Sequence, residues 1–132
     1  RVADMGGVRL GLSSGHDLRL PLVSQQLAEA GADILAVPGA FPVTTGEAHW
    51  EVLLRARAIE TGCYVIAPAQ CGMHEGGKQS WGHSLIVDPW GRVLANAGTA
   101  PGIAMAVIDL GRIAETRRAL PVLHEGRDTI PA

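Results

Sequence analysis

The chain has 132 residues, of which 18% are charged and 47% are hydrophobic, and its formal net charge is −2 at pH 7. This length suits one domain with a buried core, and the balanced charge excludes the basic surface of nucleic-acid binders and of polybasic membrane-surface proteins. Apolar runs such as 64–69 are far shorter than the roughly 20 residues of a membrane span, and no signal-peptide pattern is visible. Two cysteines are too few for a disulfide framework, so we expect a cytoplasmic protein. The balanced charge and the short apolar runs predict no nucleic-acid or membrane partner.

The first predicted elements are a strand and a helix. Residues 8–14 are predicted to form the strand, which Gly15 ends. Pro21 suits the first turn of a helix, and the apolar residues that follow at helical spacing stop at Gly31, which suits a left-handed C-cap. The sequence therefore predicts a strand, a turn and a helix over residues 8–31.

A short apolar strand and a longer helix are predicted next. Residues 34–37 are apolar and are closed by a Pro-Gly pair, as in a buried strand. Apolar residues at helical spacing predict a helix over 47–61, with Thr45 or Gly46 as its N-cap and Gly62 at its end.

The rest of the chain is predicted to be mostly strand. In chain order we expect a strand at 64–69, a hairpin of strands 84–87 and 93–95 around the turn Asp88-Pro89-Trp90-Gly91, a strand at 103–108, and a helix at 110–118. Asp109 is expected to cap this last helix, and the chain from Pro121 onward is expected to be irregular.

This order of elements predicts an α/β fold. The continuous apolar strands indicate a sheet that is buried on both faces. The predicted helices suffice to cover one face only, so we expect something else to cover the other.

Several motifs, in this order, resemble one known family. They are DLRLP at 17–21, GADILAVPGAF at 31–41, TGEAHWEVLLRARAIE at 45–60, CYVIAPAQCG at 63–72, WGHSLIVDPWGRVLA at 81–95 and HEGR at 124–127. The chain is similar to the C-terminal half of nitrilase-superfamily carbon-nitrogen hydrolases, nearest the Nit and ω-amidase branch. The resemblance implies that residues 1–132 form part of an αββα sandwich, with the sheet carrying helices on one face.

The same resemblance implies an assembly. Two such units usually pair through helices, and the segments 22–30 and 47–61 are the implied contacts. We therefore expect a homo-oligomer or a complex with a homologous subunit.

The catalytic residues of the family are missing from this chain. The family uses a cysteine nucleophile, a glutamate base, a lysine and usually a second glutamate, and relatives read close to ICYDLRFPEL at the nucleophile elbow. When this motif is aligned with the sequence, its cysteine falls on Gly15 and its tyrosine on His16. Its phenylalanine falls on Leu20 and its glutamate on Leu22. The other catalytic groups come from an N-terminal half that this chain does not contain. No catalytic side chain is retained, and we expect no hydrolysis.

Ligand binding is still expected at the elbow. The backbone N–H of His16 corresponds to an oxyanion-hole donor in relatives, and His16 and Phe41 are the predicted substrate-binding residues. We expect a small amide or carboxylate ligand, no cofactor and no metal.

Other nucleophiles are less favoured than simple packing. Neighbouring strand residues point to opposite faces, so Ser14 faces away from the elbow site, and Ser13 lies about 6 to 7 Å back along the strand. Cys71 lies near His74 and Glu75, which together offer a thiolate-imidazole pair, but an ordinary thiol at the pocket rim is the favoured reading. Cys63 is expected to pack as a small hydrophobic residue.

A zinc site from Cys63, Cys71, His74 and His83 fails on distance. An extended strand between the two cysteines would separate them by about 25 Å, which leaves only Cys71 and His74 able to share a metal ion.

The remaining polar residues of the motifs are expected to be structural. The rings of His49 and His83 are each expected to bond a backbone carbonyl or a carboxylate. Arg55, Arg57 and Glu60 are expected to form solvated or interface ion pairs on one helix. The segment 88–91 is expected to serve mainly as a turn and only secondarily as part of a pocket.

Overall fold

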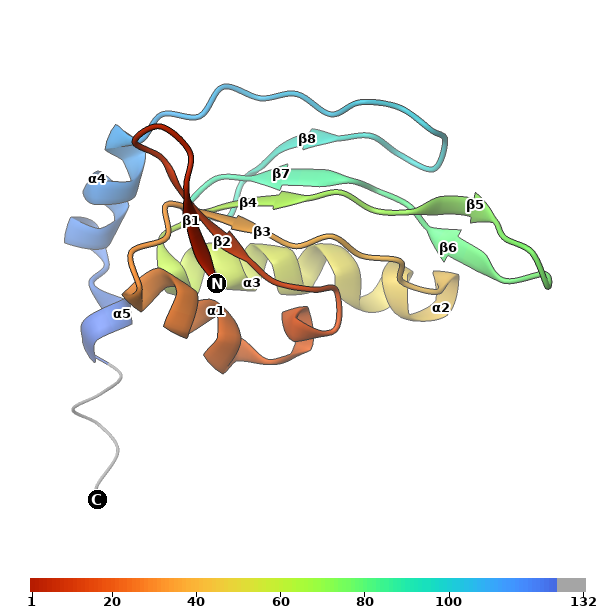
Figure 1. Cartoon of the computed structure of the whole chain (residues 1–132), viewed down its shortest axis with the longest axis horizontal. Helices are drawn as coiled ribbons and strands as arrows, with labels where there is room; N and C mark the ends of the chain where they lie inside the picture. Colours follow the sequence, from red (N-terminus) through yellow and green to blue (C-terminus); the bar gives the residue numbers. More distant parts are fainter. Residues whose placement is uncertain (126–132) are drawn as a thin grey trace, which may run out of the picture.

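A computed structural model of the chain describes residues 1–125 (Figure 1). Its elements in chain order are β1 (Val2–Asp4), β2 (Arg9–Leu12), the 3₁₀ turn η1 (Asp17–Arg19), α1 (Pro21–Glu29), β3 (Ile34–Ala36), α2 (Val43–Thr45), the π-helical turn η2 (Gly46–Trp50), α3 (Glu51–Thr61), β4 (Tyr64–Ala67), β5 (Cys71–Met73), β6 (Gln79–Trp81), β7 (Leu85–Val87), β8 (Val93–Asn96), α4 (Gly111–Ala119) and α5 (Val122–Glu125). None of the helices within residues 1–125 has the length and apolar character needed to cross a bilayer.

A mixed sheet of six strands forms the centre of the fold. Its order is β1-β2-β3-β4-β7-β8, and β5 and β6 form a separate two-stranded sheet. Strands β2, β3 and β4 are parallel, whereas the pairs β1/β2, β4/β7 and β7/β8 are antiparallel. Helices α1 and α3 lie along the same face of the sheet (Figure 1). The predicted α/β class is confirmed, whereas the expectation that helices cover one face only was wrong, because α4 packs on the opposite face.

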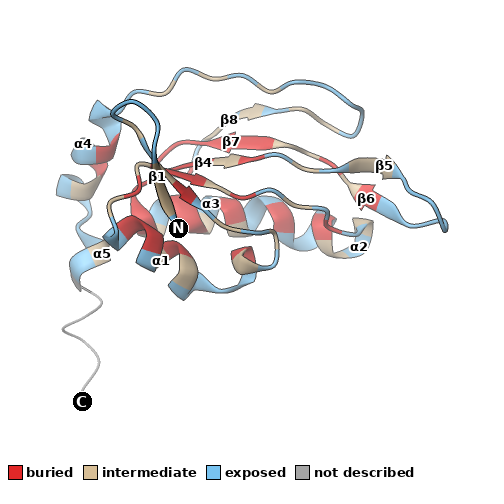
Figure 2. Cartoon of the chain, in the orientation of Figure 1, coloured by how far each residue is buried: buried red, intermediate tan, exposed pale blue. Residues whose placement is uncertain are grey.

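The main core lies between the sheet and these two helices. Buried side chains gather on the strands and on the inward sides of α1 and α3 (Figure 2). Leu35 and Val65 from the sheet pack there with Leu54 from α3, and all three are at most 1% exposed. Burial of such aliphatic side chains provides most of the driving force for folding.

Part of the opposite face of the sheet is covered by α4. Ile113 of α4 packs in a second cluster with Ile34 and Tyr64 of the sheet. The Tyr64 hydroxyl donates a hydrogen bond to the backbone carbonyl of Asp109 at 3.0 Å, which fixes the start of α4 on this face. The additional cover expected from the sequence therefore comes in part from the last predicted helix.

The predicted N-terminus of the long helix was wrong. The helical segment begins at Val43, directly after Pro42, and runs through a π-helical turn into α3. Thr45 makes no capping bond, and its hydroxyl instead donates back to the Pro42 carbonyl at 3.4 Å. Gly46 serves close packing, because a Cβ there would collide with the Trp81 side chain. The predicted end of the helix is confirmed, since Gly62 has φ +63°.

The predicted strand at 103–108 does not form among the described residues. Its side chains alternate as in a strand, and Ile103, Met105 and Val107 are 87%, 83% and 89% exposed. However, residues 100–108 make no backbone hydrogen bond to any other residue that the structure describes. The sequence pattern is that of a strand, and what is missing is a neighbouring strand to pair with.

The remaining differences are local. Strand β1 and the β5–β6 hairpin were not predicted, and the short helix α5 replaces the start of the expected irregular tail, the rest of which lies outside the described residues. The predicted cap of the last helix is confirmed, because the Asp109 carboxylate accepts a hydrogen bond from the Gly111 N–H at 2.9 Å.

Candidate functional site

The elbow lies between the end of β2 and the start of α1. The carboxylate of Asp17 accepts hydrogen bonds from the backbone N–H of Ser14 at 2.8 Å and from its hydroxyl at 3.0 Å. These bonds stabilise the ionised carboxylate and lower the pKa of Asp17, the backbone bond being the larger cause. Together they close the turn around Gly15.

An arginine of α3 holds the next residues of the elbow. The Nε and Nη2 atoms of Arg57 both donate to the backbone carbonyl of Leu18, at 3.0 and 2.8 Å, and Nη1 donates to Glu60 at 3.0 Å. The pairing of Arg57 with Glu60 is confirmed. Of the two settings expected for it, solvated or at an interface, the solvated one was wrong for Arg57, because the residue is only 4% exposed. Arg57 thus fixes the elbow to the core helix.

The centre of the elbow holds no side chain. A Cβ placed on Gly15 would lie 3.0 Å from the Gly39 Cα and 3.1 Å from the Pro38 carbonyl oxygen. Such distances are tighter than ordinary carbon contacts. A larger residue at position 15 therefore requires the 38–39 backbone to move by a few tenths of an ångström.

A cavity of about 630 Å³ opens at the elbow and brings both predicted binding residues together. It is lined by Ser14, Gly15, His16, Arg19, Pro38, Gly39, Ala40, Phe41, Pro42 and Gln70. The guanidinium carbon of Arg19 lies 4.7 Å from the centre of the Phe41 ring, in a cation–π contact. His16 and Phe41 therefore line one cavity, as the prediction requires.

Arg19 and Gln70 also line this cavity, although neither was predicted as a binding residue. The motif DLRLP contains Arg19 next to the elbow, and a basic side chain at that place was an available signal for anion binding. Arg19 also contacts the Nδ1 atom of His49 at 3.1 Å through Nη1. The expected carbonyl or carboxylate partner of His49 was therefore wrong, whereas His83 does bond a backbone carbonyl, that of Trp81, at 2.9 Å.

A second cavity of about 530 Å³ adjoins the first beneath the β5–β6 hairpin. It is lined by Ala40, Pro42, Gln70, His74, Lys78, Gln79 and Ser80. The Nε2 atom of His74 lies 2.6 Å from the hydroxyl oxygen of Ser80, so the two side chains are hydrogen bonded. No hydrogen bond between His74 and Cys71, the alternative pairing, is found among the described residues.

The other candidate nucleophiles are engaged in packing. The Ser13 hydroxyl donates to the Ala36 carbonyl at 3.0 Å, and Ser14 is bonded to Asp17. Cys63 is fully buried, and burial raises the pKa of its thiol. Within residues 1–125 no group of three or more His, Cys, Asp or Glu side chains is arranged to hold a metal ion.

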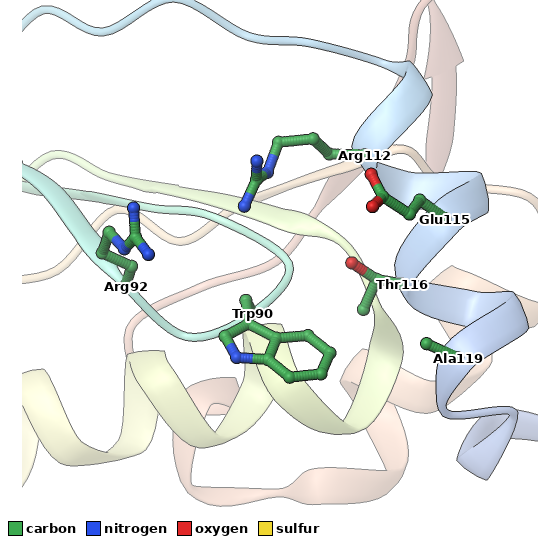
Figure 3. Close-up of a pocket in the computed structure, with 6 residues that line it drawn as sticks. All are labelled: Trp90, Arg92, Arg112, Glu115, Thr116 and Ala119. Carbon is green, nitrogen blue, oxygen red and sulfur yellow. The ribbon is translucent and has the colours of Figure 1, made fainter.

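A third cavity of about 290 Å³ lies between the β7–β8 turn and α4 and shares no residue with the other two (Figure 3). Trp90 and Arg92 from the turn face Arg112 from α4 across it. The predicted turn is confirmed, because the Asp88 carboxylate accepts from the backbone N–H groups of Trp90 and Arg92, both at 2.9 Å. Arg112 lies 3.7 Å from the same carboxylate, so this cavity is organised around a structural turn and is separate from the elbow.

Comparison with known sequences establishes the family. The sequence model of the carbon-nitrogen hydrolase family matches residues 1–118. The chain belongs to this family. The resemblance to the nitrilase superfamily, Nit branch, is thereby confirmed.

Named relatives support the assignment and show how much of them the chain covers. A deaminated glutathione amidase of Homo sapiens is 54% identical over 119 residues, which are 90% of this chain and 36% of that protein. The Caenorhabditis elegans NitFhit protein superposes with a TM-score of 0.91 at 46% identity, over 97% of this chain and 31% of that chain. The chain thus spans about a third of the length of these relatives.

A further solved relative displays the chemistry of its own site. An amidase from Nesterenkonia sp. AN1 was captured with acrylamide added to its active-site cysteine, and it superposes with a TM-score of 0.72 at 28% identity over 98% of this chain and 48% of that chain. At the elbow of the present chain, where the family resemblance places that cysteine, stands Gly15.

Proposed function

We propose that this chain contributes the elbow side of an amide-binding site and performs no carbon-nitrogen hydrolysis of its own. The observation that carries the proposal is Gly15. In cysteine-dependent amide cleavage, the thiolate attacks the acyl carbon, the amine leaves with a proton, and water then hydrolyses the thioester. Glycine has no side-chain atom that forms this bond, so the covalent step has no nucleophile at position 15.

Binding is supported by the features that the elbow retains. Ser14 and Asp17 close the turn and Arg57 holds its carbonyl, so the backbone is fixed without any side chain at residue 15. The cavity beside it carries the Arg19 guanidinium, which suits a carboxylate. A small amide that bears a carboxylate matches this arrangement.

The test is direct. Purified chain is incubated with the monoamides of glutarate and succinate, and ammonia release and ligand binding are measured side by side. We expect binding without ammonia release above the blank. Ammonia release above the blank would refute the proposal, and replacing Cys63 and Cys71 by alanine would show whether either thiol causes it.

A second function is favoured by the unpaired segment 100–108. An extended segment with alternating apolar side chains and free backbone groups is a template for another strand. We propose, as the alternative, that the chain is an assembly module that pairs with a homologous subunit. The outer sides of the helices add exposed apolar residues, with Leu22 62% and Val52 60% exposed.

Sedimentation at micromolar concentration tests this alternative. Met105→Lys should weaken association, because it places a charge in the proposed contact, whereas Met73→Lys on the hairpin should not. Both methionines are exposed, at 83% and 66%, so neither change disturbs the core. A monodisperse monomer that binds no apolar dye would count against the module.

A further inference from the structure

The third cavity, between the β7–β8 turn and α4, combines an aromatic ring with two cations. The Trp90 indole lies on one side of it, and the guanidinium groups of Arg92 and Arg112 approach from the turn and from α4 (Figure 3). Trp90 is 53% exposed, so much of its ring is available for contact with a ligand. The volume of about 290 Å³ is at the lower end of ligand sites and suits a molecule of one ring and one charged group.

The turn that carries Trp90 and Arg92 is held in place from two sides. The Asp88 carboxylate fixes the backbone of both residues from within the turn. The Nε atom of Arg55 on α3 donates to the Gly91 carbonyl at 2.7 Å. Because the turn is already ordered, a ligand that binds to it loses little affinity to the ordering of the backbone.

The wall that α4 contributes is fixed as well. Arg117 on its inner side donates through Nε to the Thr61 carbonyl at 3.2 Å and through Nη2 to the Ala32 carbonyl at 3.1 Å. Thr116 and Ala119, which lie one turn apart on α4, line the cavity beside these anchors. The cavity therefore lies between two elements that are each bonded to the core.

The charges on the walls favour an anion. The Arg92 guanidinium forms no ion pair or hydrogen bond with any residue of the described range 1–125. Arg112 Nη2 lies 3.7 Å from the Asp88 carboxylate, which is longer than a hydrogen bond and leaves its N–H donors available. Two like charges that face each other repel, and an anion between them removes this repulsion.

The acidic residue on the wall does not neutralise these cations. Glu115 is three residues after Arg112 on α4, but the two form no ion pair within the described part of the chain. The Arg112 side chain instead extends towards the turn, away from Glu115 (Figure 3). Glu115 is exposed, so solvent and salt screen its charge.

We propose that this cavity is a binding site for an aryl phosphate monoester, with the aromatic ring on Trp90 and the phosphate between Arg92 and Arg112. Aromatic rings pair favourably with indole by offset stacking. A phosphate monoester has three terminal oxygens and a charge of about −1.5 to −2 at pH 7, so it can bond to two guanidinium groups from opposite sides. A carboxylate has two oxygens in one plane, which a single guanidinium satisfies. The site shares no lining residue with the elbow cavity and does not depend on the function proposed there.

Three compounds test the ring and the phosphate separately in calorimetric titrations of the whole chain. Phenyl phosphate has both groups, cyclohexyl phosphate has the same charge without a flat ring, and benzoate has the ring with a carboxylate. We expect phenyl phosphate to bind about tenfold more tightly than either of the others. Trp90→Leu should remove the preference for phenyl over cyclohexyl phosphate, and it changes an exposed residue, so the core is not disturbed.

Three charge variants test the role of the arginines. Arg92→Gln should weaken the binding of phenyl phosphate about tenfold, as the loss of one charge-assisted contact does. Arg118→Gln is the matched control, because it removes the same charge from an exposed residue of α4 that does not line the cavity, and it should leave the affinity unchanged. Glu115→Gln removes a charge of the opposite sign from the same cavity and should not weaken binding.

The indole N–H resonance of Trp90 shows where the compound binds. It should shift when phenyl phosphate is added, and Arg19→Gln in the elbow cavity should change neither this shift nor the affinity. Absence of phenyl phosphate binding, equal binding of cyclohexyl phosphate or benzoate, or an unchanged affinity in Arg92→Gln would overturn the proposal. So would binding that is lost in Arg19→Gln and leaves the Trp90 resonance in place, because the compound would then lie at the elbow.

Discussion

Replacing Arg57 by leucine tests how the elbow is held. The change keeps an apolar side chain against the core but removes both hydrogen bonds to the Leu18 carbonyl and the pair with Glu60. Leu18 is 1% exposed, so its carbonyl loses its partners in a buried place, which costs about 1 to 3 kcal/mol. The Glu60 side chain is 30% exposed, and its pair therefore adds less than about 1 kcal/mol. We expect a loss of about 1 to 4 kcal/mol in the free energy of unfolding.

Urea unfolding at pH 7, followed by far-ultraviolet circular dichroism, measures this loss. Glu60→Gln is the control, because it removes the ion pair and leaves the bonds to Leu18, and it should cost less than about 1 kcal/mol. Amide chemical shifts of residues 16–19 should change in Arg57→Leu and stay nearly constant in Glu60→Gln. If Arg57→Leu and Glu60→Gln unfold at the same urea concentration, Arg57 does not hold the elbow.

Three further predictions concern single groups. Burial raises the pKa of the Cys63 thiol, so the thiol ionises first in the unfolded chain, and the free energy of unfolding should fall as pH rises above about 9. Urea unfolding at pH 8 and pH 10 should show a smaller fall in Cys63→Ala than in the unaltered chain. Hydrogen bonds from Ser14 lower the pKa of Asp17, so the stability that this carboxylate provides is present above pH 3.8 and is lost as pH falls through the lower pKa of the folded state. Ser14→Ala should raise the pKa of Asp17 in a carboxyl NMR titration, and an unchanged pKa would contradict the role of the Ser14 hydroxyl. Gly91→Ala should destabilise the chain more than Gly76→Ala, by about 1 kcal/mol or more in thermal unfolding, because both have positive φ but only at Gly91 does a Cβ meet a side chain of α3, at 2.6 Å.

The parts of the fold that could be predicted are those with local causes. Gly31 and Gly62 end their helices with φ +93° and +63°, as a glycine after an amphipathic segment indicates. The start of the long helix could not be predicted from Thr45 and Gly46, because Pro42 sets it earlier and Gly46 is required by the packing of Trp81, which lies 35 residues away in the sequence. Such a long-range contact leaves no local pattern.

The strand expected at 103–108 shows a different limit. Alternation of apolar residues indicates which face of a segment suits burial, and residues 103–108 do alternate in exposure. Whether the segment is a strand depends on a hydrogen-bonding neighbour, and among the described residues none is present. Periodicity is a property of one segment, whereas strand formation is a property of two.

The candidate site could be predicted only where a motif identified it. His16 and Phe41 line the elbow cavity as expected, but the contribution of the β5–β6 hairpin was missed. The glycines at 72, 76 and 77 suggest a loop there, and the pairing of Cys71 with Trp81 that makes it a hairpin depends on contacts across ten residues. The same hairpin brings Ser80 to the His74 ring as its hydrogen-bond partner.

Gly15 differs from the cysteine of the family in its chemistry rather than in its backbone conformation. Gly15 is not among the glycines with positive φ, so its backbone conformation is one that other residues adopt, although a Cβ there would lie 3.0 Å from the Gly39 Cα. What holds the turn lies on either side of it, in the bond of Ser14 to Asp17 and in the clamp of Arg57 on Leu18. Since neither contact involves the side chain of residue 15, the elbow keeps its shape when the nucleophile is absent. Under the proposed function, a site that is built in this way binds its ligand and lacks only the bond-forming step.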